Sequence, residues 1–282
     1  MTGSITVTAP AKVNFRLDVL KKRADGYHEL RMIMQRIDLC DQIDITLSPG
    51  SGIKLSCEGS PYIPSDSSNI VWRAADAILK EKNSSFALDI HLRKQIPVAA
   101  GLGGGSSDAA AVLAGLNSLI GLNLTIDRLR EIALSLGADV PFFITGEAAF
   151  AEGVGEILTP LTAIPKLWLL LINPGIHIPT PWAYKNLGLT TEKVAAKLPF
   201  LYGSAADVCA ILSNDLEPVA IKRYPLIAEV KQELIRRGAM GSLMSGSGSS
   251  VFGIFESKES AEYAFETFPA KTGWFMKVVS TI

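Results

Sequence analysis

Four glycines within five residues, Gly101–Gly105, constrain this chain more than any other segment. Glycine weakens helix and strand interiors, so such a cluster is typical of backbone that turns sharply or approaches another group closely. Ser106-Ser107-Asp108 and the alanine-rich stretch 109–119 follow, which predicts a helix capped by a Ser or Asp side chain. Backbone N–H groups at such a turn and the positive end of the helix dipole form a phosphate cradle. The alternative is a tight turn with no ligand.

The cluster differs from the familiar phosphate loops. A P-loop reads G-x-x-x-x-G-K-[ST], and no lysine follows these glycines. A dinucleotide-binding fingerprint reads G-x-G-x-x-G, and the sixth position counted from Gly101 is Ser106. The protein-kinase motifs His-Arg-Asp and Asp-Phe-Gly do not occur in the sequence. The sequence therefore predicts a phosphate cradle of another class.

The composition limits which binding partners and which cellular compartment are expected for this chain. The chain of 282 residues has 27 Lys and Arg against 28 Asp and Glu, a net charge of −1, so we expect no nucleic-acid partner. The three cysteines, an odd number without C-x-x-C spacing, predict neither a disulfide framework nor a zinc site. A reducing cytoplasm is the simplest location for such a chain. The N-terminal residues lack the pattern of a signal peptide, and we expect no membrane span.

Hydropathy patterns along the chain predict an α+β fold, and the length fits one large domain or two smaller ones. Apolar residues alternate with polar ones over 12–19, which predicts a half-buried strand. A weakly patterned stretch at 153–166 predicts a boundary that divides the chain into 1–157 and 158–282. The expected helices are 70–79, 109–119, 126–136, 181–187, 226–237 and 258–268. The other expected strands are 41–47, 53–57, 86–92, 142–144, 148–151, 168–172, 240–243, 250–255 and 274–279.

Three motifs resemble the superfamily of galactokinase, homoserine, mevalonate and phosphomevalonate kinases. The family's phosphate loop reads Pro-x-x-x-Gly-Leu-Gly-Ser/Gly-Ser/Gly-Ser, which Pro97–Ser106 matches throughout. Pro10–Asn14 and Met244–Phe252 resemble the family's N-terminal and C-terminal motifs, in the same order along the chain. The resemblance implies an N-terminal domain like domain 2 of ribosomal protein S5 and a ferredoxin-like C-terminal domain. It places the active site in the cleft between them, with the ATP loop and catalysis on the first domain.

Four segments resemble one branch of that superfamily, whose members phosphorylate the 2-hydroxyl of a cytidine-diphosphate polyol in the non-mevalonate isoprenoid pathway. These segments are Pro10–Leu17, Arg23–Leu30, Gly137–Phe143 and Ile178–Pro181. The resemblance implies ATP and Mg²⁺ and a small-molecule substrate. The ATP-binding residues it implies are Lys94, Pro97, Val98, Ala99, Ala100, Gly101, Leu102, Gly103, Gly104, Gly105, Ser106 and Ser107. For Lys94 the alternative is a solvated strand end.

Asp139 is the candidate catalytic base. Phosphoryl transfer needs in-line positioning, charge stabilisation and a group that orients the nucleophile and takes its proton. Asp139 lies in an uncharged segment between Gly137 and Pro141, where a carboxylate needs a partner. Lys12 is the natural partner, because an ammonium would keep the carboxylate ionised. The resemblance implies the same roles, and a purely structural ion pair is the alternative.

The resemblance also implies residues for the cytidine side of the substrate. Tyr27 would stack on the cytosine and His28 would hydrogen-bond its edge, although a Tyr-His pair in a polar loop is more often surface. Thr180 lies in the loop that resembles the cytidine-side loop, and Tyr184 either covers the other face of the base or belongs to the core. Asn14 shares a strand face with Lys12, so we expect it to contact substrate.

Some points stay open from sequence. Ala99 stands where some relatives have Gly, a change that the backbone tolerates unless its φ is positive. No carboxylate apart from Asp139 suggests a Mg²⁺ ligand, so phosphates and water are expected to hold the ion. Competing functions are another kinase of the superfamily, a non-catalytic nucleotide-binding regulator and an RNA-binding module. The chain is expected to be a monomer or a weak homodimer.

Overall fold

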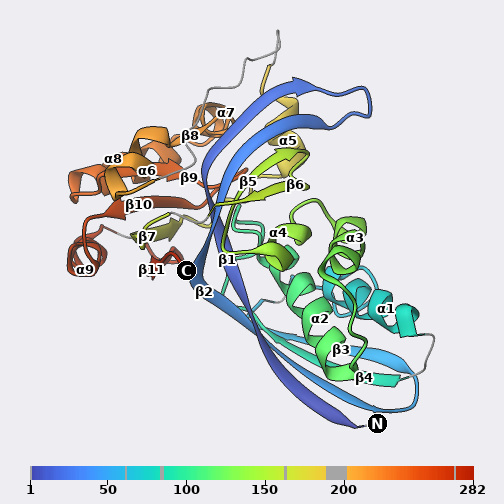
Figure 1. Cartoon of the computed structure of the whole chain (residues 1–282). Helices are drawn as coiled ribbons and strands as arrows, with labels where there is room; N and C mark the ends of the chain where they lie inside the picture. Colours follow the sequence, from blue (N-terminus) through green and yellow to red (C-terminus); the bar gives the residue numbers. More distant parts are fainter. Residues whose placement is uncertain (1, 61, 83–85, 162–163, 189–201, 270) are drawn as a thin grey trace. The chain divides into compact units, whose positions relative to one another are not determined.

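Figure 1 shows the computed structural model of the chain, which describes residues 2–60, 62–82, 86–161, 164–188, 202–269 and 271–282. The chain forms two compact units. Unit 1 comprises Met1–Ala11, Leu39–Val98 and Gly103–Gly146, and unit 2 comprises Lys12–Asp38, Ala99–Leu102 and Glu147–Ile282. Both contain helices and strands, so the expected two-domain α+β fold is confirmed. The boundary expected after residue 157 stays a prediction.

Strands of unit 1 come from the N-terminal third of the chain. They are parts of β1 (Gly3–Lys22) and β2 (His28–Pro49), together with β3 (Gly52–Glu58) and β4 (Phe86–Arg93). The order β3-β4-β2-β1 places β4 parallel to β3 and antiparallel to β2. Ile43, Ile45 and Leu47 alternate with polar residues and are buried, so the period-2 pattern identifies the core face correctly.

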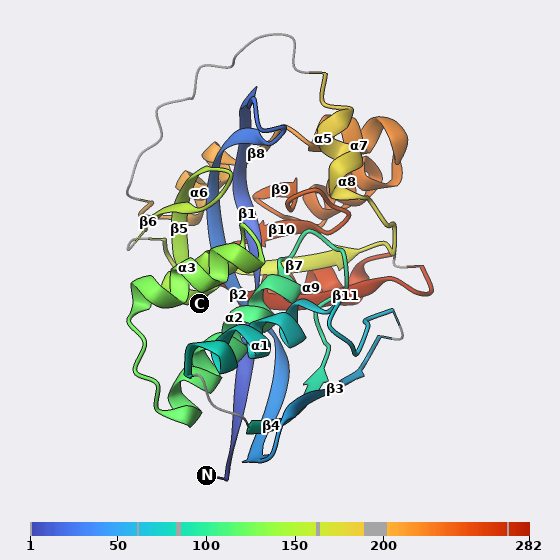
Figure 2. The ribbon, with the colours of Figure 1, turned by 90° about the vertical axis from the view of Figure 1, so that its right-hand side faces the viewer.

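Among its described residues, unit 1 also contains the helices α1 (Ile70–Lys82), α2 (Gly104–Ile120), α3 (Ile126–Leu136) and α4 (Val140–Thr145). The N–H of Val71 donates to Asn69 Oδ1 at 2.8 Å, so the Asn69 side chain caps the start of α1. Figures 1 and 2 show α1 and α2 side by side, and α2 buries Val112 and Leu116. These contacts fix the direction of α2, whose first turn forms part of the glycine cluster.

The structure corrects two local expectations in unit 1. The strand expected at 142–144 is wrong, because these residues lie in α4. Pro141 fits the first turn of a helix, and a short apolar run alone does not distinguish a buried strand from a buried helix. The Ser or Asp cap of α2 is also wrong, because α2 begins at Gly104 and Gly103 occupies the N-cap position without a side chain.

The later part of β1, which belongs to unit 2, is buried on both faces. The sequence predicts a half-buried strand with Lys12, Asn14 and Asp18 on a polar face, yet these residues are at most 5% exposed. Buried polar groups need partners. The Asp18 carboxylate accepts hydrogen bonds from the Arg16 guanidinium at 2.6 and 3.0 Å. Arg16 and Asp18 lie two positions apart on the same face of β1, so their ion pair allows this polar face to be buried.

Unit 2 contains a four-stranded antiparallel sheet of order β11-β7-β10-β9, in the lower part of the left-hand side of Figure 1 and the centre of Figure 2. Helix α8 packs on β9 and β10, and α9 packs on β7 and β11. The sequential order β7-α8-β9-β10-α9-β11 is the βαββαβ pattern of ferredoxin-like folds, so this expectation is confirmed. These elements are β7 (Trp168–Asn173), α8 (Leu226–Arg236), β9 (Gly241–Met244), β10 (Val251–Phe255), α9 (Lys258–Thr267) and β11 (Phe275–Ser280).

The remaining elements of unit 2 pack around the long strands and the sheet. Strand β5 pairs with β2 over Leu30–Gln35, β6 pairs with β5, and β8 runs parallel to β1. The bounds are β5 (Ala148–Gly153), β6 (Ile157–Pro160), α5 (Thr180–Lys185), α6 (Ala205–Ile211), β8 (Ser213–Asn214) and α7 (Glu217–Arg223). Across the described residues, none of the helices has the length and apolarity to cross a bilayer.

Candidate active site

The first glycine cluster meets a second glycine-rich segment, Ser245–Ser249, at Gly101 in unit 2. Gly101 has φ of +78°, and a Cβ at this position would lie 2.1 Å from the backbone oxygen of Ser245. Real Cβ atoms do not approach so closely, so a side chain at Gly101 would force the two segments apart. The Ser245 hydroxyl donates to the Gly101 oxygen at 3.0 Å. The turn between β9 and β10 therefore supports the first glycine cluster directly.

The same contact includes the start of the unit 2 part of β1. The N–H of Asn14 donates to Ser245 Oγ at 3.2 Å, and the N–H of Lys12 donates to the Leu102 oxygen at 2.9 Å. The N–H of Ser250 donates to the Ala100 oxygen at 3.2 Å. Two segments far apart in sequence, β1 and the turn at 245–250, thus hold residues 99–102 in place through the backbone oxygens of Ala100, Gly101 and Leu102.

Lys12 and Asn14 lie on the same side of β1. The Lys12 ammonium donates to Asn14 Oδ1, and Asn14 Nδ2 lies 3.6 Å from Met32 Sδ. Lys12 is 5% exposed and Asn14 is fully buried. The shared face that the period-2 pattern predicts is confirmed, and the ammonium has an oriented neighbour that fixes its position.

The second half of the glycine cluster lies in unit 1 and forms the start of α2. Gly103, with φ of +69°, is the N-cap and offers no side-chain oxygen to the first N–H groups of the helix. These groups have no partner within a helix and attract an anion. Ser107 Oγ is buried and, within the described residues, has no hydrogen-bond partner. The arrangement has the donors that a phosphate cradle requires.

Lys94 is buried close to this helix start. Its side chain is 5% exposed and pairs with the carboxylates of Asp41 and Asp108, the latter at 2.7 Å. The alternative of a solvated strand end is therefore wrong. Burial, opposed by Lys94 and supported by the nearby charge of Asp41, raises the pKa of the Asp108 carboxyl to about 7.

Asp139 directly precedes α4. It is half-buried, occupies the N-cap position with φ of −82°, and is followed by Pro141 in the first turn. Gly137 ends α3, and its N–H donates to the Ala133 oxygen at 3.2 Å. Asp139 therefore lies in a short turn whose position is fixed by α3 and α4. Its pairing with Lys12 stays a prediction.

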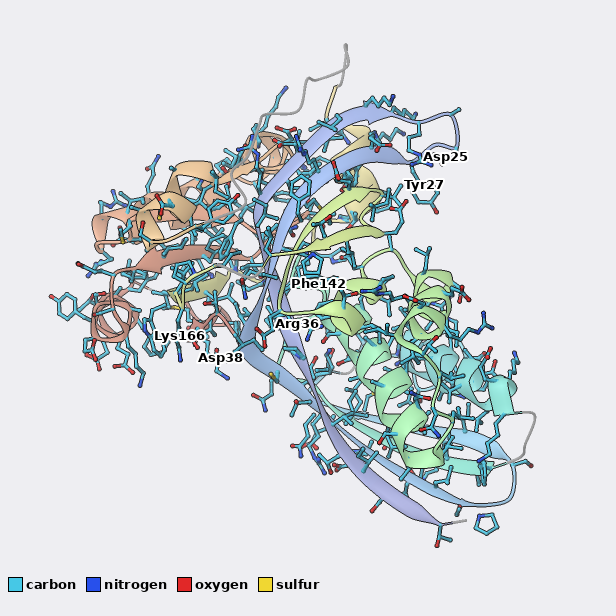
Figure 3. The ribbon with its side chains drawn as sticks, in the orientation of Figure 1. Asp25, Tyr27, Arg36, Asp38, Phe142 and Lys166 are labelled. Carbon is cyan, nitrogen blue, oxygen red and sulfur yellow. The ribbon has the colours of Figure 1, made fainter. Side chains whose placement is uncertain are left out.

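Tyr27 lies at the tip of the hairpin between β1 and β2, next to Asp25 (Figure 3). The N–H of Tyr27 donates to Asp25 Oδ1 at 3.0 Å, and Gly26 adopts φ of +89° to make the turn. Tyr27 is 64% exposed, so its ring is accessible to a ligand. Its stacking on cytosine stays a prediction.

His28 contacts Tyr184 of α5. Their ring centroids are 5.0 Å apart and their planes are inclined by 23°, which is a stacked pair. Tyr184 is half-buried and does not belong to the buried core. Burial, with a smaller effect of Lys22, lowers the pKa of His28, so the neutral imidazole is favoured at neutral pH.

Thr180 begins α5 and contacts the second glycine-rich segment. Its hydroxyl lies 2.8 Å from the hydroxyl of Ser247, and either group can be the donor. The loop before α5 is therefore connected to the same turn that supports Gly101. Hydroxyl and aromatic groups of this kind suit a polar, planar ligand.

Comparison with known proteins identifies the family. Residues 69–147 match the GHMP kinases N terminal domain and residues 197–272 match the GHMP kinases C terminal domain. The chain is 55% identical over 278 residues to 4-diphosphocytidyl-2-C-methyl-D-erythritol kinase of Citrifermentans bemidjiense and 56% identical to that of Geobacter sulfurreducens, each over 99% of both chains. The chain belongs to the 4-diphosphocytidyl-2-C-methyl-D-erythritol kinase family.

A solved structure supports the assignment to this kinase family. The crystal structure of a 4-(cytidine 5'-diphospho)-2C-methyl-D-erythritol kinase superposes with a TM-score of 0.81 at 36% identity, covering 98% of this chain and 99% of that one. Homoserine kinase from Cytophaga hutchinsonii superposes with a TM-score of 0.74 at 20% identity, which shows a shared fold alone. The chain is an ATP-dependent small-molecule kinase, as the sequence motifs predict.

For a kinase of the 4-diphosphocytidyl-2-C-methyl-D-erythritol kinase family, the structure adds contacts between the segments that the sequence singles out, and it adds Asp41 and Asp108, which sequence reasoning missed. Ser245 and Ser247 connect the second glycine-rich segment to predicted site residues. Asp41 and Asp108 pair with Lys94 beside the start of α2. An aspartate within an alanine-rich helix segment is the signal that could have identified Asp108, because an isolated buried carboxylate needs a cation.

Proposed function

We propose that this chain transfers the terminal phosphoryl group of ATP to the 2-hydroxyl of 4-diphosphocytidyl-2-C-methyl-D-erythritol, as a step of the non-mevalonate isoprenoid pathway. The observation that carries the proposal is the 55% identity, over 99% of both chains, to a relative named for that substrate. The glycine cluster at the start of α2 supports it, because the first N–H groups of a helix have no partner within the helix and suit a phosphate.

The proposed nucleotide site is the segment Pro97–Ser107 with Lys94. Backbone donors of the cluster bind phosphate oxygens, and the dipole of α2 adds a favourable field. Mg²⁺ is proposed as the companion ion of ATP. Among the described residues no group of three acidic, His or Cys side chains could hold a metal, so phosphates and water would supply most ligands. The buried Ser107 hydroxyl, which has no hydrogen-bond partner in the part of the chain that the structure describes, suits a further oxygen ligand.

In the proposed mechanism Asp139 accepts the proton of the substrate hydroxyl and Lys12 keeps the carboxylate ionised. Positioning and electrostatic stabilisation provide most of the rate in phosphoryl transfer. The buried contact between Lys12 and Asn14 supports this role, because it restricts the ammonium to one orientation. Asn14 itself is proposed to contact the substrate.

The cytidine group is proposed to bind near the β1–β2 hairpin and α5. Tyr27 provides an exposed aromatic face, and the neutral His28 ring can donate or accept at the edge of a base. Thr180 and Tyr184 complete this side. The stacked pair of His28 and Tyr184 supports the proposal, because it holds an aromatic surface in one orientation.

We also propose that the enzyme works in the cytoplasm as a monomer or weak homodimer, without a nucleic-acid partner. Cys57 and Cys209 are free thiols, which suits a reducing compartment. Sedimentation at micromolar concentration measures the oligomeric state. A stable tetramer would contradict this proposal.

A coupled assay of ADP release tests the substrate. Purified protein with ATP and Mg²⁺ is expected to turn over 4-diphosphocytidyl-2-C-methyl-D-erythritol and to leave homoserine and mevalonate unchanged. Phosphate on the 2-hydroxyl is located by NMR of the product. Turnover of homoserine or mevalonate in place of the cytidine substrate would overturn the proposed function.

A further inference from the structure

A buried cluster of one lysine and two aspartates lies beside the start of α2. Lys94 follows β4, Asp41 lies on β2 and Asp108 lies on α2. The Lys94 ammonium donates to the Asp41 carboxylate and to Asp108 Oδ2, and the three side chains are 5%, 0% and 3% exposed. Charges buried to this degree are costly unless they are paired. The cluster therefore ties three elements of unit 1 to one another.

Asp41 fixes the chain that enters the glycine cluster. Its Oδ1 accepts the N–H groups of Gln95 at 2.6 Å and Ile96 at 2.9 Å, while its Oδ2 pairs with Lys94. Pro97, the first residue of the phosphate motif, follows immediately. One carboxylate thus determines the position at which the motif begins.

The other end of the glycine cluster lies against the same lysine. A Cβ on Gly104, the first residue of α2, would be 3.2 Å from Lys94 Nζ and 3.0 Å from Ile96 Cγ2. Asp108 lies one helical turn further along α2 and accepts from that ammonium at 2.7 Å. The first turn of α2 is therefore packed on Lys94 and held there by Asp108.

We propose that Asp41, Lys94 and Asp108 are positioning residues that preorganise the glycine cluster for the triphosphate of ATP. The cluster fixes the chain on both sides of the motif, at Gln95–Ile96 and at Gly104–Asp108. Preorganised donors bind more tightly than mobile ones, because less order is lost on binding. Lys94 then acts on ATP through the backbone of the cluster. This inference rests on the proposed function, since it takes the cluster to be the ATP site.

The test compares Asp108→Ala, Asp108→Asn and Lys94→Met with the parent enzyme. Positioning residues behind a binding group typically change affinity by about 10–100-fold, so Asp108→Ala and Lys94→Met are expected to raise the KM and the Kd for ATP by about tenfold or more. The KM for the cytidine substrate is expected to stay within about twofold of the parent value. Asp108→Asn keeps an oxygen acceptor for Lys94 and is expected to recover most of the ATP affinity.

Lys54→Met is the matched control. Lys54 also pairs with an aspartate in unit 1, Asp89 at 2.9 Å, but its side chain is 76% exposed. The ATP affinity of Lys54→Met should equal that of the parent, because exposed ion pairs contribute little to stability. A variant that is merely less stable has fewer active molecules, which lowers the apparent kcat and leaves both KM values unchanged.

Direct calorimetry of ATP binding separates this inference from the proposed function. If Asp108→Ala and Lys94→Met bind ATP with the parent affinity, the positioning role is overturned. If Asp108→Ala and Asp108→Asn lose the same ATP affinity, Asp108 does not act as a hydrogen-bond acceptor for Lys94. If Lys94→Met does not fold, the two Asp108 variants decide. A parent enzyme that binds ATP but leaves the cytidine substrate unphosphorylated contradicts only the proposed substrate. A parent that does not bind ATP overturns both.

Discussion

The imidazole of His28 stacks on the phenol ring of Tyr184, with ring centroids 5.0 Å apart and planes inclined by 23°. His28 begins β2 and Tyr184 lies on α5, so the contact joins two segments far apart in the sequence. Aromatic pairs of this kind contribute about 0.5–1.5 kcal/mol beyond the area they bury. The pair holds an aromatic surface next to the exposed Tyr27, where the cytidine group is proposed to bind.

Replacing Tyr184 tests this surface. Base stacking on an aromatic side chain is worth about 1–3 kcal/mol, so Tyr184→Ala is expected to raise the KM for the cytidine substrate by about tenfold. The KM for ATP should be unchanged. Tyr184→Phe keeps the ring and is the control, with a KM close to that of the parent. An unchanged KM for the cytidine substrate in Tyr184→Ala would exclude Tyr184 from the site.

Asp139→Asn tests the proposed base. The amide cannot accept the proton of the substrate hydroxyl, so turnover is expected to fall by about 10²–10⁴-fold. ATP affinity and thermal stability should remain close to those of the parent. Asp127→Asn is the matched control, because Asp127 lies on α3 of the same unit and its side chain is 81% exposed. Turnover of Asp139→Asn near the parent value would remove Asp139 from this role.

Local sequence signals predicted most elements of the fold correctly. Alternation identified β3, β4 and the second half of β2, and helical spacing identified α1 and α3. Helix α2 was expected at 109–119 but begins at Gly104, inside the glycine motif. The order of strands in the ferredoxin-like sheet followed from resemblance. Periodicity alone cannot give such an order, because it reports which face of an element is buried and not which element covers it.

What the sequence did not predict are contacts between distant segments. The pairing of Lys94 with Asp41 and Asp108 requires β2, the end of β4 and α2 to converge, and no local pattern encodes that convergence. The support of Gly101 by Ser245 is of the same kind. Phe142 was assigned to a strand, because a short apolar run is compatible with both kinds of element.

Ala99 provides a prediction about stability. Its φ is +52°, a left-handed conformation that costs a residue with Cβ about 1–2 kcal/mol. Ala99→Gly relieves this strain but adds about 0.4–1 kcal/mol of entropy to the unfolded chain, so the free energy of unfolding should rise by up to about 1.6 kcal/mol. Ala99→Val should lower it by about 1–3 kcal/mol, because a branched side chain tolerates positive φ poorly.

Urea denaturation measures these changes. The control is Ala24→Gly, because Ala24 is an exposed loop residue outside the left-handed region. This control carries the entropic cost without relief of strain, so its free energy of unfolding should fall. If Ala99→Gly and Ala24→Gly lower stability equally, the strain at Ala99 has no energetic consequence.

Asp108 makes stability depend on pH. Burial raises the pKa of this carboxyl to about 7, and the charged or titratable groups near it are Lys94, Asp41 and Cys57. An unfolded aspartate titrates near pH ~3.9, so between about pH 4 and pH 7 the folded chain binds a proton that the unfolded chain has released. The free energy of unfolding contributed by Asp108 therefore falls as the pH rises through this range. At higher pH both states are ionised, and the folded state retains the full cost of the buried charge.

Urea denaturation of the parent and of Asp108→Asn between about pH 5 and pH 8 measures this contribution. The contribution of His28 to the free energy of unfolding has the opposite pH dependence. Burial lowers the pKa of His28, so the folded state loses stability as the pH falls below about 6.5. His28 is present in both proteins, so its effect cancels in the difference. Relative to Asp108→Asn, the parent is expected to lose stability steadily from about pH 5 to pH 7. A difference that is independent of pH would show that Asp108 stays ionised throughout, with Lys94 compensating its burial in full.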